Sequence, residues 1–241
     1  MIGRDKKGYN MIVSGLQKLT LLDFPGKTAC IIFTRDCNFR CPFCHNADLV
    51  IGDAEPMDNE EIFAYLDKRK KLLDGVVITG GEPLLQKDIA DFIRRVKSYG
   101  YAVKLDTNGT YPDRLQALLD EGLVDYVAMD IKNGEEEYLE TAGVSNESLI
   151  ARVKESISLI MASGVAYEFR TTVVKGLHTK ESLLSAFAMI KGAEHYYLQG
   201  FVDSGALIEG QGLSVFSKAE MQEFVLLAKD FVKEVSLRGY D

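Results

Sequence analysis

Residues 28–46 read TACIIFTRDCNFRCPFCHN, a short apolar run rich in β-branched residues that is followed at once by cysteines. The run at 28–34 has the composition of a strand buried on both faces of a sheet. Cys37, Cys41 and Cys44 then lie on the loop that leaves this strand. The stretch therefore places three thiols at the C-terminal end of a buried strand, where proteins built from parallel βα units carry their sites.

The rest of the chain repeats this pattern of short apolar runs separated by amphipathic segments. The expected strands after the first are 75–79, 101–107, 125–131, 166–174 and 195–199, and the expected helices are 58–73, 87–99, 112–121, 146–163, 180–191 and 217–236. Six strands alternating with helices predict an α/β fold with parallel strands and right-handed crossovers.

Polar side chains gather where these strands end. They are Cys37 beyond the first strand, Glu82 beyond the second, Asp106 and Asn108 at the third, Asp130 and Lys132 at the fourth, Arg170 and Thr172 late in the fifth, and Gln199 at the end of the sixth. Any one of them is equally well explained as a turn former or a helix cap. All six ends together favour a partial (β/α)6 barrel of the TIM type with a site at its mouth.

The chain shows no repeat, no low-complexity linker and no break in composition, which predicts one domain over residues 1–241. Residues 1–27 are expected to form a lead-in with a short hairpin, and 28–199 the barrel core. Residues 200–241 are expected to form a long loop and a C-terminal helix.

Composition and charge limit the partners. The formal net charge is −8 and the pI is near 5.1, which argues against nucleic acid as a partner. No apolar run approaches the roughly 20 residues that a membrane span needs, and the polar N-terminus lacks a secretory signal. We therefore expect a cytoplasmic protein whose four cysteines are reduced.

Four chemistries suit the cysteine spacing. Zinc would take the three thiolates with His45, although a ligand adjacent to Cys44 reaches the same ion awkwardly. Residues 41–45 also match the pattern for c-type haem attachment, and Cys41 with Cys44 would suit a redox dithiol. A [4Fe–4S] cluster held by three thiolates would leave one iron open to a ligand. The spacing favours the iron–sulfur cluster and leaves zinc as the next alternative.

CNFRCPFC at 37–44, together with GGEP at 80–83, resembles the radical S-adenosylmethionine (SAM) superfamily. The longer segments at 20–46, 78–86, 105–112 and 129–132 resemble the glycyl-radical-enzyme activases, over roughly residues 15–200. Within that group they are most similar to the proteins that activate anaerobic ribonucleotide reductases, with the pyruvate formate-lyase activating enzymes as near relatives.

The resemblance implies one [4Fe–4S] cluster on Cys37, Cys41 and Cys44, whose fourth iron binds SAM. It also implies SAM contacts, each carried over by position. These are the backbone of Phe43 at the adenine, Gly80, Gly81 and Glu82 at the methionyl amino group, Asp106 with Thr107 and Asn108 at the third strand end, Asp130 and Lys132 at the ribose, and Arg170 at the carboxylate.

The reaction implied is one-electron reductive cleavage of SAM to a 5′-deoxyadenosyl radical, which takes a hydrogen atom from a glycine of a partner enzyme. The expected partners are anaerobic ribonucleotide reductase and an electron donor such as flavodoxin or ferredoxin. Two alternatives stay open: a radical SAM enzyme acting on a small molecule, such as a nucleoside-modifying synthase, and a non-enzymatic zinc-binding domain.

The chain departs from the activase pattern in two ways. Several activases have a histidine after the sixth strand, where this chain reads Gly200-Phe201-Val202. Cys30 is the only further cysteine, so a second all-cysteine cluster is excluded, and Cys30 is expected to pack inside its strand. His178 and His195 are expected to be structural or exposed.

Overall fold

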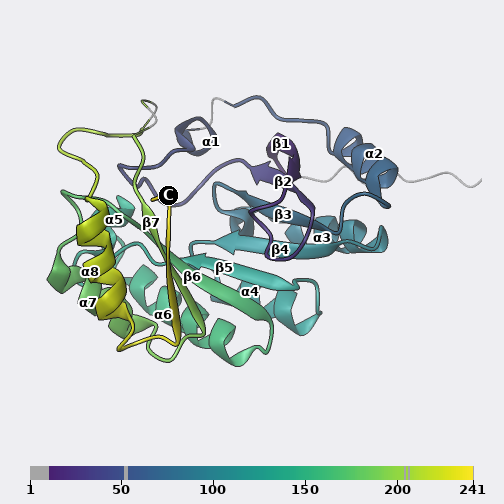
Figure 1. The fold of residues 1–241 in the computed structure, drawn as a ribbon. Coiled ribbons are helices and arrows are strands. Elements are labelled where there is room, and N and C mark those ends of the chain that lie inside the picture. Colours follow the sequence, from purple (N-terminus) through teal and green to yellow (C-terminus); the bar gives the residue numbers. More distant parts are fainter. Residues whose placement is uncertain (1–10, 52–53, 204, 206, 241) are drawn as a thin grey trace, which may run out of the picture.

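The computed structural model describes residues 11–51, 54–203, 205 and 207–240. One sheet of eight strands runs through it in sequence order (Figure 1). The strands are β1 (Val13–Thr20), β2 (Ala29–Thr34), β3 (Gly75–Gly80), β4 (Ala102–Thr107), β5 (Tyr126–Asp130), β6 (Ala166–Val173), β7 (His195–Gly200) and β8 (Glu234–Arg238). The six expected strands correspond to β2–β7, and each pairs in parallel with the next.

The sheet has one additional strand at each edge. β1 pairs antiparallel with β2, so the lead-in contributes only one strand of a hairpin and the first strand of the predicted core contributes the other; residues 1–10 lie outside the described part of the chain. β8 pairs in parallel with β7. In the described residues β1 and β8 are the two ends of the strand order, so the barrel is open between them.

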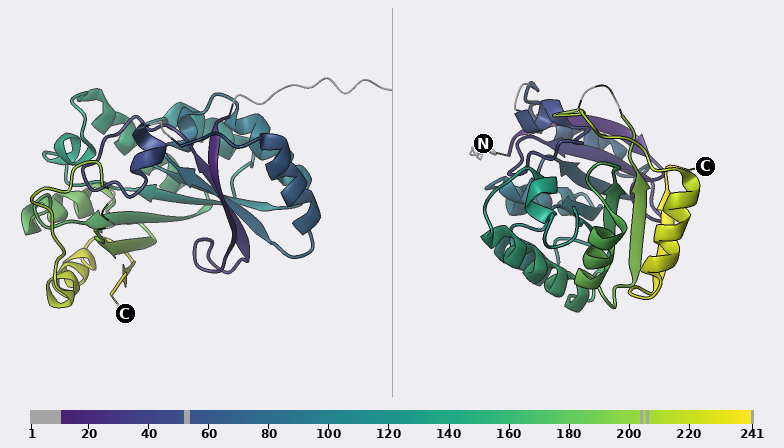
Figure 2. Two further views of the ribbon diagram at one scale, coloured as in Figure 1. Left: turned by 90° about the horizontal axis from the view of Figure 1, so that it is seen from above. Right: turned by 90° about the vertical axis from the view of Figure 1, so that its left-hand side faces the viewer.

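The longer helices follow the strands and lie along the outer side of the curved sheet (Figure 2), whereas the short helices α1 (Ala47–Ile51) and α5 (Tyr138–Ala142) lie beside the cysteine loop. The other helices are α2 (Asn59–Arg69), the 3₁₀ turn η1 (Pro83–Leu85), α3 (Ile89–Ser98), α4 (Pro112–Asp120), α6 (Ser148–Ala162), α7 (Lys180–Met189) and α8 (Lys218–Ala228). None of the helices in the described residues is both long and apolar enough to span a membrane.

The expected helix at 217–236 is wrong in its second half. α8 ends at Ala228, and Glu234–Arg238 forms β8 instead. Val235 and Leu237 pack against the main core, whereas the residues between and beside them face the other way. A period of two over only five residues is too short to stand out beside the helical pattern that precedes it.

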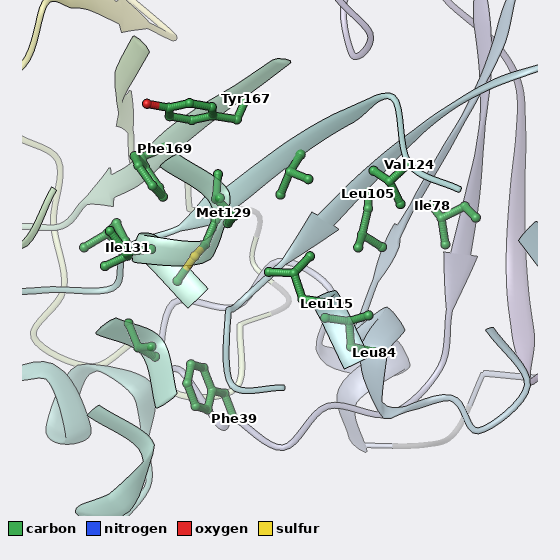
Figure 3. Packing of buried hydrophobic residues seen from close by; sticks show 14 of the residues in the cluster. Phe39, Ile78, Leu84, Leu105, Leu115, Val124, Met129, Ile131, Tyr167 and Phe169 are labelled. Carbon is green, nitrogen blue, oxygen red and sulfur yellow. The ribbon is translucent and has the colours of Figure 1, made fainter. Parts of the chain in front are cut away.

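The two faces of the sheet differ in chemistry. Side chains from neighbouring strands, among them Ile78, Leu105, Met129 and Phe169, gather in one large buried cluster with residues of the outer helices (Figure 3). Cys30 belongs to this cluster and is fully buried, as expected for a packing residue.

The inner face begins apolar and becomes charged. At the N-terminal ends of the strands Phe24, Ala29, Ile31 and Val77 form a small separate cluster. Further along, alternate positions carry charged groups, beginning with Lys104, which is only 2% exposed. Residues two apart on a strand share a face. On β4 and β6 a charged inward-pointing residue is therefore followed, two positions later, by a second charged residue on the same face.

Candidate active site

A cavity of about 260 Å³ lies at the C-terminal ends of the parallel strands. Its lining comes from the loop after β2, from the ends of β3 to β7 and from the start of α1. The lining residues are Cys37, Phe39, Cys41, Phe43, Cys44, His45, Asn46, Val50, Thr79, Gly80, Gly81, Asp106, Thr107, Asn108, Asp130, Lys132, Arg170, Thr172 and Gln199. The fold thus brings every predicted site residue except Glu82 to one cavity.

The cysteine loop supplies three free thiols to this cavity. Burial raises the pKa of Cys37 to about 12 and that of Cys41 to about 11, although the nearby Lys132 ammonium opposes the rise at Cys41. Cys37 Sγ accepts a hydrogen bond from Phe39 N at 3.4 Å, and Cys41 Sγ lies 3.8 Å from Ala142 O. Thiolates in such a setting need a cationic partner, which a metal centre provides.

The donor set suits an iron–sulfur cluster. Among residues 11–51, 54–203, 205 and 207–240, no three Cys, His, Asp or Glu side chains converge as ligands of a single metal ion would. The three thiols nevertheless share one cavity with charged and backbone polar groups. Three thiolates on one cavity suit a cluster in which each would bind a different iron, and the charged and polar lining suits a polar ligand beside it.

A continuous ion-pair network forms another part of the cavity. Arg170, on β6, donates to Asp130 Oδ1 at 2.9 Å and to Asp106 Oδ2 at 3.1 Å. Lys132 Nζ donates to Asp130 Oδ2 at 3.0 Å, and Lys104 Nζ donates to Asp106 Oδ1 at 2.5 Å. The Arg170 side chain is 14% exposed, so its guanidinium is held in place while it still reaches the cavity.

The network fixes the protonation states of its members. Burial alone would raise the pKa of Asp106 and Asp130, but the Arg170 guanidinium and the adjacent lysines outweigh burial, and both pKa values lie below the ordinary range. The carboxylates in turn raise the pKa of Lys132 and Arg170 above their ordinary values despite burial. The cavity therefore presents fixed charges of both signs, which suits a zwitterionic ligand.

The resemblance implies that the Glu82 carboxylate meets a ligand amino group, and this contact remains a prediction. The side chain is fully buried and does not line the cavity. Its carboxylate accepts from Leu84 N at 2.9 Å, Thr107 Oγ1 at 2.8 Å and Asn108 N at 2.7 Å. Burial raises its pKa to about 7 against these hydrogen bonds. Glu82 therefore fastens the turn after β3 to the end of β4.

The glycine pair also has a structural cause that the sequence did not reveal. A Cβ on Gly80, whose φ is +111°, would lie 2.4 Å from Thr34 O, and a Cβ on Gly81 would lie 1.9 Å from Asp36 O. Only glycine allows the β3 turn to pack this closely against the chain that leads into the cysteine loop. The pair still lines the cavity, so contact with a ligand backbone remains a prediction.

The loop after β7 is attached to the cysteine loop. Phe201 stacks on His45 with ring centroids 6.0 Å apart, and Glu209 N donates to Pro42 O at 2.9 Å. His45 lines the cavity. An imidazole thus reaches the site from the cysteine loop, while the loop after β7 contributes a phenyl ring beneath it.

Sequence reasoning missed several residues of the site. Lys104 was detectable as a lysine inside an otherwise apolar strand, two positions before Asp106. Asn38 gave no signal, because its role depends on contacts with the distant β4 turn. The remaining histidines behave as expected: His178 is buried with Nε2 2.8 Å from Lys132 O, and His195 is exposed beside Glu234.

Comparison with known proteins follows the same segments. Residues 31–185 match the profile of the family described as the Radical SAM superfamily. A protein of Methanocaldococcus jannaschii, named as a "putative glycyl-radical enzyme activating enzyme", is 33% identical in an alignment of 231 residues that covers 94% of this chain and 95% of that protein.

Two further relatives match over shorter lengths. The pyruvate formate-lyase-activating enzyme of Listeria monocytogenes is 30% identical over 152 residues, covering 57% of this chain and 60% of that protein. The GTP 3′,8-cyclase of Campylobacter fetus is 29% identical over 192 residues, covering 75% of this chain and 58% of that protein.

Among solved structures, Streptococcus suis SuiB bound to the precursor peptide SuiA superposes with a TM-score of 0.66 at 14% identity. The superposition covers 88% of this chain and 48% of SuiB. At this identity the similarity concerns the fold alone.

Proposed function

This chain belongs to the radical SAM superfamily, and from that membership we propose that it is an activase that forms a glycyl radical on a partner enzyme. The similarity to the M. jannaschii protein, which extends over nearly the whole of both chains, is the observation that carries the proposal. The similarity to a pyruvate formate-lyase-activating enzyme supports the same class of reaction. We take anaerobic ribonucleotide reductase as the partner, from the sequence segments quoted above.

Superfamily membership brings one [4Fe–4S] cluster and SAM as cofactors. In the proposal Cys37, Cys41 and Cys44 hold three irons of the cluster, and the fourth iron is left for SAM. When bound and reduced by a carrier such as flavodoxin or ferredoxin, these cofactors supply a 5′-deoxyadenosyl radical that takes a hydrogen atom from a glycine Cα. The protein's part is to bind the cluster and SAM, to orient SAM, and to keep competing reactants away from the radical.

The charged network performs the orientation. Arg170 is restrained by two carboxylates, so it presents its charge in one direction without losing side-chain entropy on binding. Arg170 and Lys132 suit the carboxylate of SAM, and Asp106 and Asp130 suit its ammonium and ribose hydroxyls. Phe43, buried beside the third cysteine, supplies backbone at the adenine.

The similarity to a GTP 3′,8-cyclase supports a second candidate, a radical SAM enzyme acting on a small molecule. This match covers a smaller part of both chains than the match to the M. jannaschii protein. We therefore rank it second.

Anaerobic reconstitution with iron and sulfide tests the proposal. The protein with SAM, a reductant and an anaerobic ribonucleotide reductase or pyruvate formate-lyase is expected to give the EPR doublet of a glycyl radical. The Cys41→Ala variant should give none. Cleavage of SAM with GTP consumed and no glycyl radical on any partner would favour the second candidate. Stoichiometric zinc in place of the cluster would reject both.

A further inference from the structure

Asn38, Asn108 and Thr110 form a closed ring of hydrogen bonds behind Cys37. Asn108 Nδ2 donates to Asn38 Oδ1 at 2.9 Å, and Asn38 Nδ2 donates to Thr110 Oγ1 at 2.9 Å. Thr110 Oγ1 then donates to Asn108 Oδ1 at 2.7 Å, which completes the ring. Asn108 and Thr110 are 6% and 1% exposed, so water does not compete strongly with these bonds.

One backbone group fixes the direction of the Asn108 amide. Thr110 N donates to Asn108 Oδ1 at 3.0 Å. A backbone N–H is always a donor, so the oxygen of the amide must face Thr110 and the NH₂ must face the opposite side. On that side the NH₂ meets Asn38 Oδ1 and, at 3.9 Å, Cys37 Sγ.

Glu82 holds the backbone of the same residue. Its Oε2 accepts from Asn108 N at 2.7 Å, and its Oε1 accepts from the neighbouring Thr107 side chain at 2.8 Å. Rotating the Asn108 amide away from Cys37 would leave the Thr110 N–H and the amide oxygen of Asn38 without these partners, which is costly for buried polar groups. Two sets of hydrogen bonds therefore direct the Asn108 NH₂ toward the Cys37 sulfur: Glu82 holds the Asn108 backbone, and Thr110 holds the Asn108 amide oxygen.

Cys37 differs from Cys41 in this respect. Cys37 Sγ faces two N–H donors, those of Phe39 N and Asn108 Nδ2, whereas the polar neighbour of Cys41 Sγ is the carbonyl oxygen of Ala142. Hydrogen-bond donors at a cluster sulfur stabilise added negative charge and raise the reduction potential. Cys37 is therefore the thiol, of these two, whose surroundings would stabilise added negative charge on a cluster.

We infer that Asn108 is a positioning residue that donates to the Cys37 sulfur and raises the reduction potential of the cluster, instead of contacting SAM. The inference rests on the proposed function, because it requires a [4Fe–4S] cluster on Cys37. Asn38, Glu82 and Asn108 come from three separate segments, and their hydrogen bonds together would set the reduction potential of the cluster.

A spectroelectrochemical titration of the full-length reconstituted protein, without SAM, tests this role. Asn108→Leu keeps the bulk of the side chain and removes the donor. It is expected to disfavour reduction about tenfold, which for a one-electron couple is a fall of about 59 mV in midpoint potential. Thr110→Val breaks the ring but keeps the Thr110 backbone bond, so a smaller fall in the same direction is expected.

Thr171→Val is the matched control, because Thr171 is equally buried and its hydroxyl bonds to Ile131 O and Tyr196, far along the chain from the cysteine loop. Its potential should equal that of the wild type. An Asn108→Leu protein with an intact cluster and the wild-type potential would overturn the inference. If Asn108→Leu fails to hold a cluster, the test compares Thr110→Val with Thr110→Ser, which keeps the hydroxyl. Equal midpoint potentials for these two variants would also overturn the inference. A wild-type protein that assembles no [4Fe–4S] cluster would instead reject the proposed function.

Discussion

Removing Arg170 should expose how much the charged network contributes to the fold. Arg170→Met keeps an apolar stem of similar length but takes away the cation that bridges Asp106 and Asp130 at 3.1 and 2.9 Å. Breaking a buried ion pair by removing one partner costs about 3–5 kcal/mol. Because Lys104 and Lys132 still pair with the two carboxylates, we expect a loss near the lower limit, about 3 kcal/mol. For a chain of this length that loss lowers Tm by about 6–12 °C.

The pH dependence separates charge from packing. In the wild type the pKa values of Asp106 and Asp130 lie below the ordinary value, so their contribution to stability is present above about pH 4 and is lost as the pH falls through the folded pKa values. Without Arg170, burial raises both pKa values, and protonation relieves the uncompensated charge. The difference between wild type and variant should therefore be largest near pH 7 and should shrink toward about pH 4.5.

Urea unfolding followed by circular dichroism at the two pH values measures this difference. Arg94→Met is the matched control, since Arg94 pairs with Glu121 and Asp91 on the exposed surface and its loss should change little at either pH. A deficit in Arg170→Met that stays constant between the two pH values would refute the reasoning, because lost packing does not titrate.

Three further changes have defined outcomes. Alanine at Cys37, Cys41 or Cys44 should each abolish stoichiometric iron and sulfide, whereas Cys30→Ala should retain both; iron analysis that shows the reverse would reject the assignment. The pKa of Glu82 is raised to about 7, so the folded wild type holds this proton more tightly than the unfolded chain and its unfolding free energy falls as the pH rises from about 5 to 8. Glu82→Gln should remove this contribution and reduce the slope; a slope equal to that of the wild type counts against a titrating Glu82. Gly81→Ala should lose about 3 kcal/mol in urea unfolding, the upper end of the cost of overpacking, because the added Cβ would meet the backbone oxygen of Asp36. Gly122→Ala has open space around the added Cβ and should lose only the cost of its positive φ, about 1–2 kcal/mol; equal losses for both would mean that the close approach is not limiting.

The strand pattern was readable because buried parallel strands are short, apolar and β-branched, and the six expected strands lie within two residues of β2–β7. β8 was not readable, since five alternating residues following a helix carry too little periodicity. The cavity lining was predictable as a group because strand ends of parallel βα units converge, whatever the individual side chains do.

The orientation of individual side chains was less predictable. The resemblance implied a ligand contact for Glu82, which remains a prediction. It gave no sign that Leu84 N, Thr107 Oγ1 and Asn108 N donate to the Glu82 carboxylate. Which donors compete for a carboxylate depends on strand register, and β3 pairs with β4 through contacts that no single segment contains. For the same reason the role of Asn38 could not be predicted from its place beside the cysteines, because it depends on a hydrogen bond with Asn108, directly after β4.

The ring of Asn38, Asn108 and Thr110 has a consequence for how such chains diverge. Each side chain gives one hydrogen bond to the ring and receives one from it, so a change at any single position breaks two of the three hydrogen bonds of the ring. Lineages that lose one member should pass through a less stable ancestor or replace several members together. In an alignment of related chains, positions 38, 108 and 110 should therefore covary as a triplet, although the first lies some 70 residues before the other two.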